Sequence, residues 1–463
     1  MFRPLILACV VLTGCTTYQP KPISPAQLAK NFDNRSLASN ALRTYMAKQV
    51  QHKIEPWPLT SWNSYMLTLA AYYYSPVLDV VRTQWGSAKA NIDVASTVPN
   101  PTLQLPFAYT TNNQSAARPY TTGIALDIPI ETAHKREYRI DQATQLSEAA
   151  GLNLANEAWA VRSQVRNALL DIYAVQERIV FLTKEVMAQQ QLLAMVRKRK
   201  AIGENTGPNV DQALLTLTQV QISLLAAQNG LHDARARLAG TIGVPIAALD
   251  SVKLNVDEFN KTDAAPPSSS AQRTALFHRV DLLSSLAKYE ATQAALQLEI
   301  AKQYPDIHIG LGYTYDVGAN KIGFGLPGIT LPIFDHNQGG IALAEAKRTE
   351  AAANTAALQD KIINDLDHAL AHYRKSLEVL HLSATLLSTA KKKIDSQAES
   401  LAAGATDRLS FTQAKADYQT NEIEHLNAVV AAQHAAGALE DAMHRPISPS
   451  ISDQITRKEA AIQ

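Results

Sequence analysis

The feature that most constrains this chain is an internal duplication. The segment VPNPTLQLPFAYTTN at Val98–Asn112 has a similar counterpart, QYPDIHIGLGYTYDV, at Gln303–Val317. GIALDIPIET at Gly123–Thr132 is likewise matched by GITLPIFD at Gly328–Asp335, and each copy then continues into a long Ala-rich segment. A repeat of roughly two hundred residues is too long for a solenoid, so it indicates a duplicated domain whose two copies share one architecture.

The N-terminus carries an export sequence. Arg3 precedes a short apolar run that ends in LTGC at Cys15. The run is too short to span a bilayer as a helix, and small residues before a cysteine are typical of a lipoprotein cleavage site. We expect a signal peptide at residues 1–14 and acylation of Cys15, with an ordinary secretory cleavage site as the alternative. Because Thr16 rather than Asp follows the cysteine, the outer membrane of a Gram-negative bacterium is the expected location.

Four segments alternate apolar residues with small or polar ones at a period of two. They predict strands at about 101–111, 120–131, 305–316 and 321–334. Runs of about 9–11 residues with one apolar face suit tilted outer-membrane strands, and a soluble sandwich with one wet face is the alternative. An open sheet edge in lipid leaves backbone groups unpaired, and the smallest closed barrels use about eight strands. The predicted barrel must therefore be shared between chains.

Apolar and small residues then recur with alternating steps of four and three, which predicts long coiled-coil helices. We expect them at about 134–200, 208–242, 338–401 and 407–443. AIGENTGP and AAGATD interrupt the long runs at matching points, where Gly203 and Gly404 suit the residue that follows a helix end. Each repeat is therefore expected to hold two strands followed by a helical hairpin, and a continuous helix from about Lys135 to Lys200 would be on the order of 100 Å long.

These breaks define the expected organisation, which is a mainly α fold with a shared transmembrane β-barrel. Aromatic residues make up only 6% of the chain, which suits long helices better than a large globular core. The expected segments are a leader or lipid tether at 15–60, repeat 1 at 61–262, a linker at 263–272, repeat 2 at 273–446 and a polar tail at 447–463.

The strand-to-helix junctions carry a family resemblance. NP at Asn100, IPIET at Ile128, YP at Tyr304 and LPIFDHNQGGIALAEA at Leu331–Ala346 resemble the TolC-like outer-membrane factors of tripartite efflux and type I secretion systems. IETAHKREYRIDQA and IFDHNQGGIALAEA are most similar to the cobalt–zinc–cadmium branch. The resemblance covers nearly the whole mature chain. It implies a homotrimer with twelve strands in one barrel and twelve hairpin helices in one periplasmic tunnel, a periplasmic adaptor and an inner-membrane pump of the RND type.

The resemblance also directs attention to the hairpin tips and the strand ends. In the family, charged or polar rings near the tip constriction hold the entrance shut, and opening untwists the hairpins between two packings. The tip candidates are Gly203, Glu204, Asp211, Gly404, Asp407 and Arg408. A solvated turn is the alternative for each of them. Pro129 and Pro332 mark the two strand-to-helix junctions.

No metal or cofactor site is expected. His368 and His372 have a ligand-competent i,i+4 spacing, but a pair on a solvated or lumenal face is the simpler interpretation. His308, on the small-residue face of a predicted strand, could touch passing cations. The chain has no GxxxxGK[ST] loop, and a formal net charge of +1 gives no reason to expect nucleic acid as a partner.

The expected function is a passive exit duct that conducts substrates, heavy-metal cations among them, from a pump and adaptor to the cell exterior. The chain is not expected to be an enzyme, because no GxSxG context or cluster of carboxylates and histidines is found. A lipid-anchored coiled-coil spacer or adhesin of the envelope is the main alternative. Besides copies of itself, the adaptor and the pump, the expected partner is outer-membrane lipid.

Overall fold

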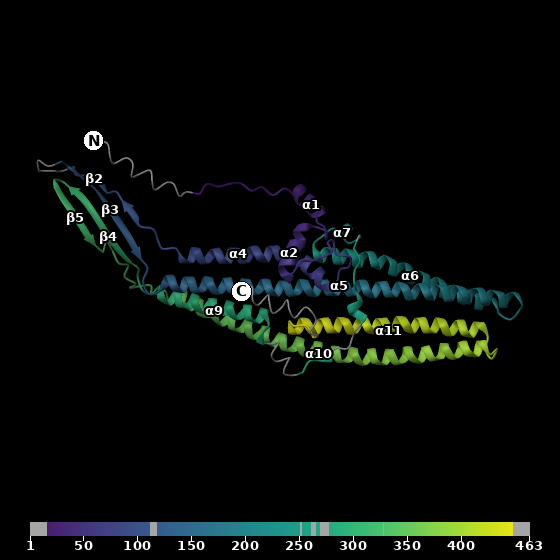
Figure 1. Cartoon of the computed structure of the whole chain (residues 1–463). Coiled ribbons are helices and arrows are strands. Elements are labelled where there is room, and N and C mark those ends of the chain that lie inside the picture. Colours follow the sequence, from purple (N-terminus) through teal and green to yellow (C-terminus); the bar gives the residue numbers. More distant parts are fainter. Residues whose placement is uncertain are drawn as a thin grey trace.

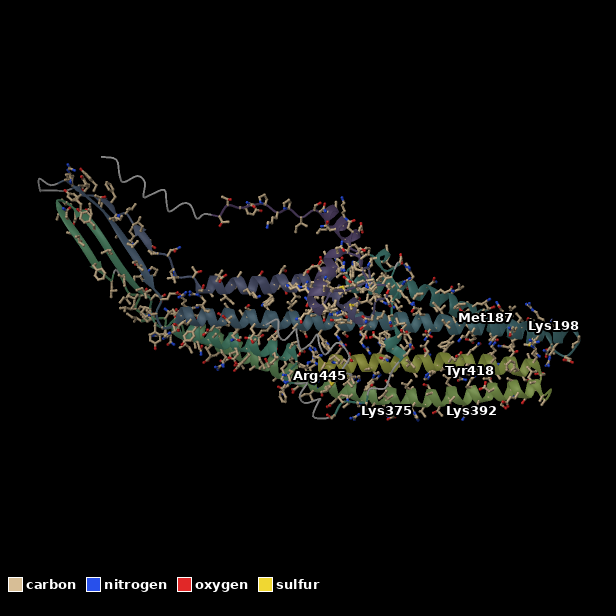
Figure 2. The ribbon with its side chains drawn as sticks, in the orientation of Figure 1. Met187, Lys198, Lys375, Lys392, Tyr418 and Arg445 are labelled. Atoms are coloured by element: carbon tan, nitrogen blue, oxygen red, sulfur yellow. The ribbon has the colours of Figure 1, made fainter. Side chains whose placement is uncertain are left out.

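The structure is a computed structural model of the chain, and it describes residues 16–111, 118–250, 252–260, 265–268, 277–326 and 328–447. The molecule is an elongated rod with a small β-sheet at one end and two helical hairpin tips at the other (Figure 1). Figure 2 places Lys198 near one tip and Arg445 near the middle of the rod. The predicted acylation site at Cys15 and nearly all of the predicted tail lie outside the described residues.

Two long helices run along the rod, α5 (Lys135–Ala201) and α10 (Gln338–Ala402). With 67 residues, α5 is about 100 Å long, since an α-helix rises about 1.5 Å per residue. At the tips the chain turns back into α6 (Gly207–Ile242) and α11 (Arg408–Met443), which have 36 residues each. Helix α5 packs on α6 and α10 packs on α11, so each repeat forms a helical hairpin.

Each repeat also has a helix before its strands, which the sequence pattern did not predict. Helix α4 (Pro76–Ser96) precedes the first strands and packs on α5, and α9 (Val280–Ala301) precedes the later strands and packs on both α5 and α10. Both lie along the half of the rod nearest the sheet, which α6 and α11 do not reach (Figure 1). The expected order of two strands followed by two helices was therefore incomplete.

The largest hydrophobic core lies in the middle of the rod, and the leader contributes to it. Leu42 and Met46 of the leader are fully buried there, together with Leu169 of α5 and Leu238 of α6. The short elements around this core are α1 (Pro25–Asp33), α2 (Asn40–Val50), α3 (Ser64–Tyr74), α7 (Ala247–Asp250) and the 3₁₀ turn η2 (Asp257–Asn260). The leader is thus an integral part of the packed structure and not only a tether.

The sheet joins the two repeats. Two short strands, β1 (Thr102–Gln104) and β2 (Phe107–Tyr109), pair with β3 (Tyr120–Ile130). Strand β3 pairs with β4 (Ile307–Asp316) over its whole length, and β4 pairs with β5 (Ala319–Gly325). All pairs are antiparallel and the order is β1-β3-β4-β5, with β2 also on β3. Within the described residues, β1, β2 and β5 therefore form the two edges.

Two of the predicted strands were wrong in extent. The first is divided between β1 and β2, where Pro106 lacks the N–H that a continuous ladder would need. The fourth was expected to reach residue 334, but β5 ends at Gly325, and the stretch 328–334 forms no strand. Alternation alone does not make a strand without a partner. The pairing of β5 with β4 stops at Gly310, so this stretch has no neighbour in the described sheet.

The two faces of the sheet differ in chemistry. One face carries large apolar side chains, and most of these are strongly exposed, among them Leu105, Phe107, Tyr109, Ile124, Leu311, Ile322 and Phe324. The opposite face carries glycine, alanine, threonine and a few charged residues. An exposed apolar surface of this kind marks contact with lipid or with another molecule. No helix in the described part of the chain combines the length and apolarity needed to cross a membrane.

Candidate functional site

The two hairpin tips have the same backbone design. Gly203 follows the end of α5 with φ +81°, and Gly404 follows α10 with φ +72°. The N–H of Glu204 donates to the Arg199 carbonyl at 2.8 Å, and the N–H of Ala405 donates to the Ser400 carbonyl at 2.8 Å. Both glycines therefore occupy a left-handed helix-ending position, where a residue with a Cβ would be strained.

A single arginine links the tips of the two repeats. Arg199, in the last turn of α5, forms an ion pair with Asp407, the N-cap residue of α11. Its Nε also lies 3.8 Å from a carboxylate oxygen of Glu204. Asp407 accepts a 2.7 Å hydrogen bond from the backbone N–H of Ser410. That bond, the Ser410 side chain and Arg199 together lower the pKa of Asp407 to about 2, so the carboxylate stays charged well into acid.

The structure brings only some of the predicted tip residues together. Glu204 and Asp407 meet on Arg199, which lies in the basic run Arg197–Lys200 at the end of α5 and was not among the predicted tip residues. Asp211 and Arg408 take part in no ion pair within the described residues. A pairing of adjacent hairpins is needed to bring Arg199 to Asp407, and the sequence pattern does not show which hairpins are adjacent.

Behind the tips, a cleft of about 520 Å³ separates the hairpins. Lys393 of α10 and Asp417 of α11 form a 3.2 Å ion pair at its wall. The other lining residues are Leu192, Val196, Asn205, Asn209, Gln397, Leu409, Ser410, Gln413 and Ala414. The tip region is therefore incompletely packed, with both polar and apolar side chains around the cleft, in contrast to the dense core at the middle of the rod.

The junction between the sheet and the long helices is fixed by Asp306. Its carboxylate accepts a 2.7 Å hydrogen bond from Lys135 Nζ and a 3.0 Å bond from the Thr132 N–H. Burial raises the pKa of Asp306, but these bonds outweigh burial and the net pKa lies below its usual value. Pro129 lies inside β3, opposite His308, and Pro332 lies in the unpaired stretch after β5.

His308 has a carboxylate partner on the small-residue face of the sheet. Its Nδ1 lies 3.1 Å from each carboxylate oxygen of Asp127 on the neighbouring strand β3. The sequence singled out His308 but not this contact. The alternation pattern does place Asp127 and His308 each on the small-residue face of a strand. The structure adds that these two strands, β3 and β4, are neighbours.

At the middle of the rod, the end of α6 meets the beginning of α4. Gly243 ends α6 with φ +88°, and its carbonyl and that of Tyr74 both accept hydrogen bonds from Arg35, at 2.7 and 3.0 Å. Arg35 belongs to the leader, between α1 and α2. We call this contact the first joint. It holds α4, which lies in the half of the rod nearest the sheet, in line with α6, which belongs to the hairpin.

The second joint is the equivalent place in repeat 2, where α11 ends and α9 begins. Arg279, only 8% exposed, donates to the Ala442 carbonyl at 2.5 Å and pairs with Asp281 at 2.7 Å. His444 ends α11 in the left-handed region, and its ring stacks on Trp159 of α5. Burial first, and then Arg279, lower the pKa of His444 to about 4. Sequence reasoning identified neither joint.

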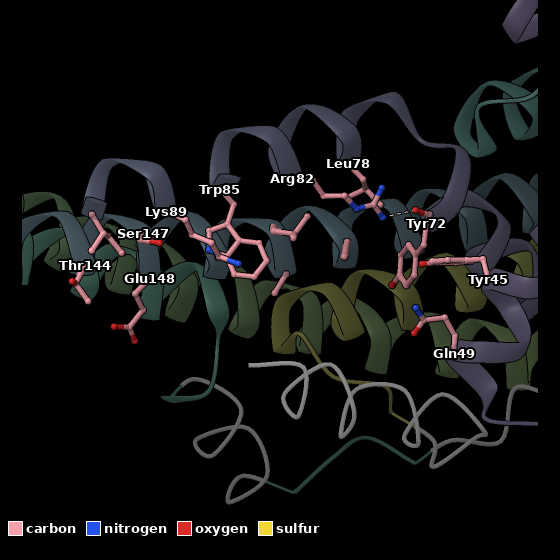
Figure 3. A pocket seen from close by; sticks show the side chains of 15 residues that line it. Tyr45, Gln49, Tyr72, Leu78, Arg82, Trp85, Lys89, Thr144, Ser147 and Glu148 are labelled. Carbon is pink, nitrogen blue, oxygen red and sulfur yellow. Dashed lines mark hydrogen bonds between the residues drawn. The ribbon is translucent and has the colours of Figure 1, made fainter. Parts of the chain in front are cut away.

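A second cleft, of about 720 Å³, lies between α4, α5 and α2 (Figure 3). Lys89 Nζ lies 3.2 Å from the centre of the Trp85 ring, and Arg82 donates to the Tyr72 carbonyl at 2.5 Å. Gly151 of α5 leaves room for Trp85, because a Cβ there would lie 3.2 Å from the indole nitrogen. The cleft thus combines aromatic walls with cationic groups at its rim.

The two histidines with i,i+4 spacing lie on the exposed side of α10. The rings of His368 and His372 are nearly parallel, with centroids 6.3 Å apart. No group of three or more His, Cys, Asp or Glu residues that could hold a metal ion occurs among the residues the structure describes. The pair by itself offers at most two protein ligands.

Comparison with known proteins gives a consistent result. The model of the outer membrane efflux protein family matches residues 72–244 and 272–443, one segment in each repeat. The cobalt-zinc-cadmium resistance protein CzcC of Cupriavidus metallidurans is 24% identical over 376 residues, which is 80% of this chain and 86% of that protein. The pyoverdine export outer membrane protein OpmQ of Pseudomonas aeruginosa is 23% identical over 65% of each chain.

Solved structures show the same fold. The outer membrane protein VceC of Vibrio cholerae superposes with a TM-score of 0.67 at 18% sequence identity, covering 83% of this chain and 97% of VceC. The prediction of a mainly helical fold of the outer-membrane channel type is therefore confirmed.

Proposed function

Because the chain belongs to the outer membrane efflux protein family, we propose that three copies close one β-barrel in the outer membrane and one helical tunnel in the periplasm. The protein acts in efflux at the outer membrane, and the proposal concerns how it does so. Repeat 1 and repeat 2, with the segment bounds expected from the sequence, would each supply one strand pair and one hairpin. The main support is the sheet, whose edges at β1, β2 and β5 have no partner strand among the described residues and which has an exposed apolar face.

Unpaired sheet edges are unfavourable in lipid, so the sheet requires further copies of the chain. Backbone groups that lack a partner inside a bilayer cost several kcal/mol each, so a sheet of this kind must be closed on itself. Its strands are too few to close alone, since the smallest membrane barrels use about eight. Pairing of β5 in one copy with β1 and β2 of the next would satisfy both edges and place the apolar face against lipid.

Mass measurement of the purified protein in detergent tests this proposal. We expect a particle of three protomers that resists dissociation when the sample is diluted. A monomer that stays in solution without detergent after removal of its lipid would overturn both the shared barrel and the duct. The predicted anchor is tested separately, because Cys15→Ala should remove the mass of the acyl chains without changing the number of protomers.

We propose further that the hairpin tips form the entrance gate, with Gly203 and Gly404 at the turns and Glu204, Asp211, Asp407 and Arg408 around them. The pairing of Arg199 with Asp407 supports this role, because it ties the two hairpins of one protomer together at their ends. Opening would then be a shear of the hairpins between two packings, which must first break this contact. The cleft behind the tips leaves space for such a movement.

Single-channel recording tests the gate. Arg199→Ala should raise the conductance or the open fraction in a planar bilayer, because it removes the cation shared by the two hairpins. Lys198→Ala is the matched control, since Lys198 belongs to the same basic run but forms no ion pair within the described residues. Equal recordings for the two variants would reject a gating role for Arg199.

We propose that the duct receives heavy-metal cations from an RND-type pump in the inner membrane through a periplasmic adaptor. The support is the likeness to a protein named for cobalt, zinc and cadmium resistance over 80% of this chain. A deletion strain should lose tolerance to at least one of these metals and regain it with the gene restored. Unchanged tolerance to all three would discard the metal assignment and leave the duct in place.

A further inference from the structure

The contact between Asp127 and His308 has the arrangement of a supported metal ligand. The two side chains come from neighbouring strands, β3 and β4, and are diagonal neighbours in the register, where Asp127 is opposite Gly310 and His308 is opposite Pro129. Nδ1 of His308 faces both carboxylate oxygens at 3.1 Å. Because an ionised carboxylate only accepts hydrogen bonds, Nδ1 must carry a proton, so in the neutral imidazole Nε2 is the nitrogen that keeps a free lone pair.

The surroundings leave that lone pair accessible. The side chain of His308 is 41% exposed and that of Asp127 is 22% exposed. The residues that follow on the same face are small, namely Ala125, Gly310, Gly312, Gly323 and Gly325. Nε2 forms no hydrogen bond within the described residues. The imidazole of His308 therefore has only small residues beyond it on this face, and its Nε2 is directed away from Asp127.

The other carboxylates near this face are already engaged. Asp306, at the base of β4, binds Lys135 and the Thr132 N–H. Asp316, at the far end of β4, binds Lys321 at 2.6 Å and the Thr121 hydroxyl at 2.8 Å. Among the described strands, Asp127 is thus the carboxylate that is paired with an imidazole. Among the described strands, the pairing of a carboxylate with an imidazole therefore occurs only where Asp127 of β3 lies beside His308 of β4.

We propose that His308, oriented by Asp127, is a transient binding site for divalent transition-metal cations on the inner wall of the barrel. Histidine that ligates a metal commonly donates its other ring N–H to a carboxylate, which fixes the tautomer and raises the basicity of the ligating nitrogen. Imidazole suits zinc, copper and nickel better than it suits magnesium or calcium. The site thus favours the metals that coordinate nitrogen.

One protein ligand per copy makes the site weak, and this is consistent with conduction, which requires that a bound ion can leave again. The inference rests on the proposed function in one respect, because it takes the small-residue face of the sheet as the inner wall. Asp127 is a positioning residue in this scheme, and Nε2 of His308 is the atom that contacts the ion.

Site-resolved chemical labelling tests the inference on the full-length protein in detergent. Diethyl pyrocarbonate modifies unprotonated imidazoles, and peptide mass spectrometry reports His308 separately from the other histidines. Zinc chloride should slow the labelling of His308 in a saturable way. Asp127→Asn should raise the zinc concentration needed for this protection by about 10- to 100-fold, which is the usual effect of removing such a partner.

Asp316→Asn is the matched control, because it removes a carboxylate from the same face without touching the imidazole pair, and it should behave like the unchanged protein. The inference is overturned if His308 does not react without zinc, if zinc gives no protection, or if Asp127→Asn needs no more zinc than the unchanged protein. Equal protection of the exposed His336 would show generic imidazole binding and would also overturn it. The labelling reads one side chain, so its failure is distinct from failure of the assembly, which the mass measurement reports.

Discussion

Replacing Gly243 with alanine should weaken the first joint. Gly243 has φ +88°, and a Cβ built there would lie 2.5 Å from the Tyr74 carbonyl oxygen and 3.0 Å from the carbonyl carbon. The Tyr74 carbonyl cannot move away freely, because it accepts a hydrogen bond from Arg35. Gly243→Ala therefore imposes both a strained backbone conformation and a steric clash with backbone atoms.

The size of the effect follows from these two contributions. A left-handed conformation costs a residue with a Cβ about 1–2 kcal/mol. Backbone shifts forced by an added methyl group typically cost about 1–3 kcal/mol more. Gly203→Ala isolates the first contribution, since Gly203 has φ +81° and a Cβ there would meet no heavy atom within 4 Å. Gly243→Ala should therefore lower the free energy of unfolding by about 2–5 kcal/mol, and Gly203→Ala by about 1–2 kcal/mol.

Guanidinium unfolding in detergent, followed by circular dichroism at one fixed protomer concentration, measures this difference. The concentration is held constant because association shifts the apparent stability of an oligomer. The midpoint for Gly243→Ala should lie clearly below that for Gly203→Ala. Equal midpoints, or a larger loss for Gly203→Ala, would refute the assignment of a close backbone contact at the joint.

Three further predictions concern the second joint and the sheet. Arg279→Met should lower the free energy of unfolding by about 1.5–3 kcal/mol, because it removes charge-assisted hydrogen bonds to the partly buried Asp281 carboxylate and to the Ala442 carbonyl, whereas an unchanged midpoint would contradict this role of Arg279. The folded-state pKa of His444 is about 4 against 6.5 for a free side chain, so the stability it contributes is present above pH 6.5 and falls by up to about 3 kcal/mol as the pH drops to about 4. Unfolding midpoints across this range should lose that slope in His444→Asn, and a slope that persists would exclude His444 as its source. Gly123→Val should reduce the yield of assembled outer-membrane protein, measured by gel filtration, because a Cβ there would lie 2.5 Å from a backbone carbonyl of β4, and an unchanged yield would contradict this close approach.

The sequence predicted elements well where a repeating pattern and a partner coincide. The heptads placed long helices at about 134–200 and 338–401, and the structure has α5 at Lys135–Ala201 and α10 at Gln338–Ala402. The same kind of reasoning failed at 328–334, because the alternation continues after the pairing with β4 has ended. Alternation reports which residues share a face, and it does not report whether a neighbouring strand is present.

The shorter helices were missed for a different reason. Helix α3 has 11 residues and α4 has 21, and they are separated at Ser75, before Pro76 begins α4, so neither presents a long heptad run. Both are held by tertiary packing on α5 and not by their own periodicity. Helix α4 covers the half of α5 that its hairpin partner α6 does not reach, and α3 packs on both α5 and α6.

The candidate sites show the same division between local and long-range information. Glu204 and Asp407 could be selected because each lies in a recognisable turn. Arg199 could not, since its role depends on two hairpins lying side by side. The pairing of Asp127 with His308 likewise depends on the β3–β4 register, which joins residues 181 positions apart in the chain. Sequence patterns thus locate single residues, and the fold decides which of them act together.

The two joint arginines come from different parts of the chain. Arg279 belongs to the second repeat and fastens that repeat with its own side chain, whereas Arg35 reaches the first repeat from outside it. The second repeat therefore supplies its own joint arginine, whereas the first repeat takes its joint arginine from the leader. A single repeat of the second kind would therefore keep its joint arginine, whereas a single repeat of the first kind would lack Arg35 unless the leader accompanied it.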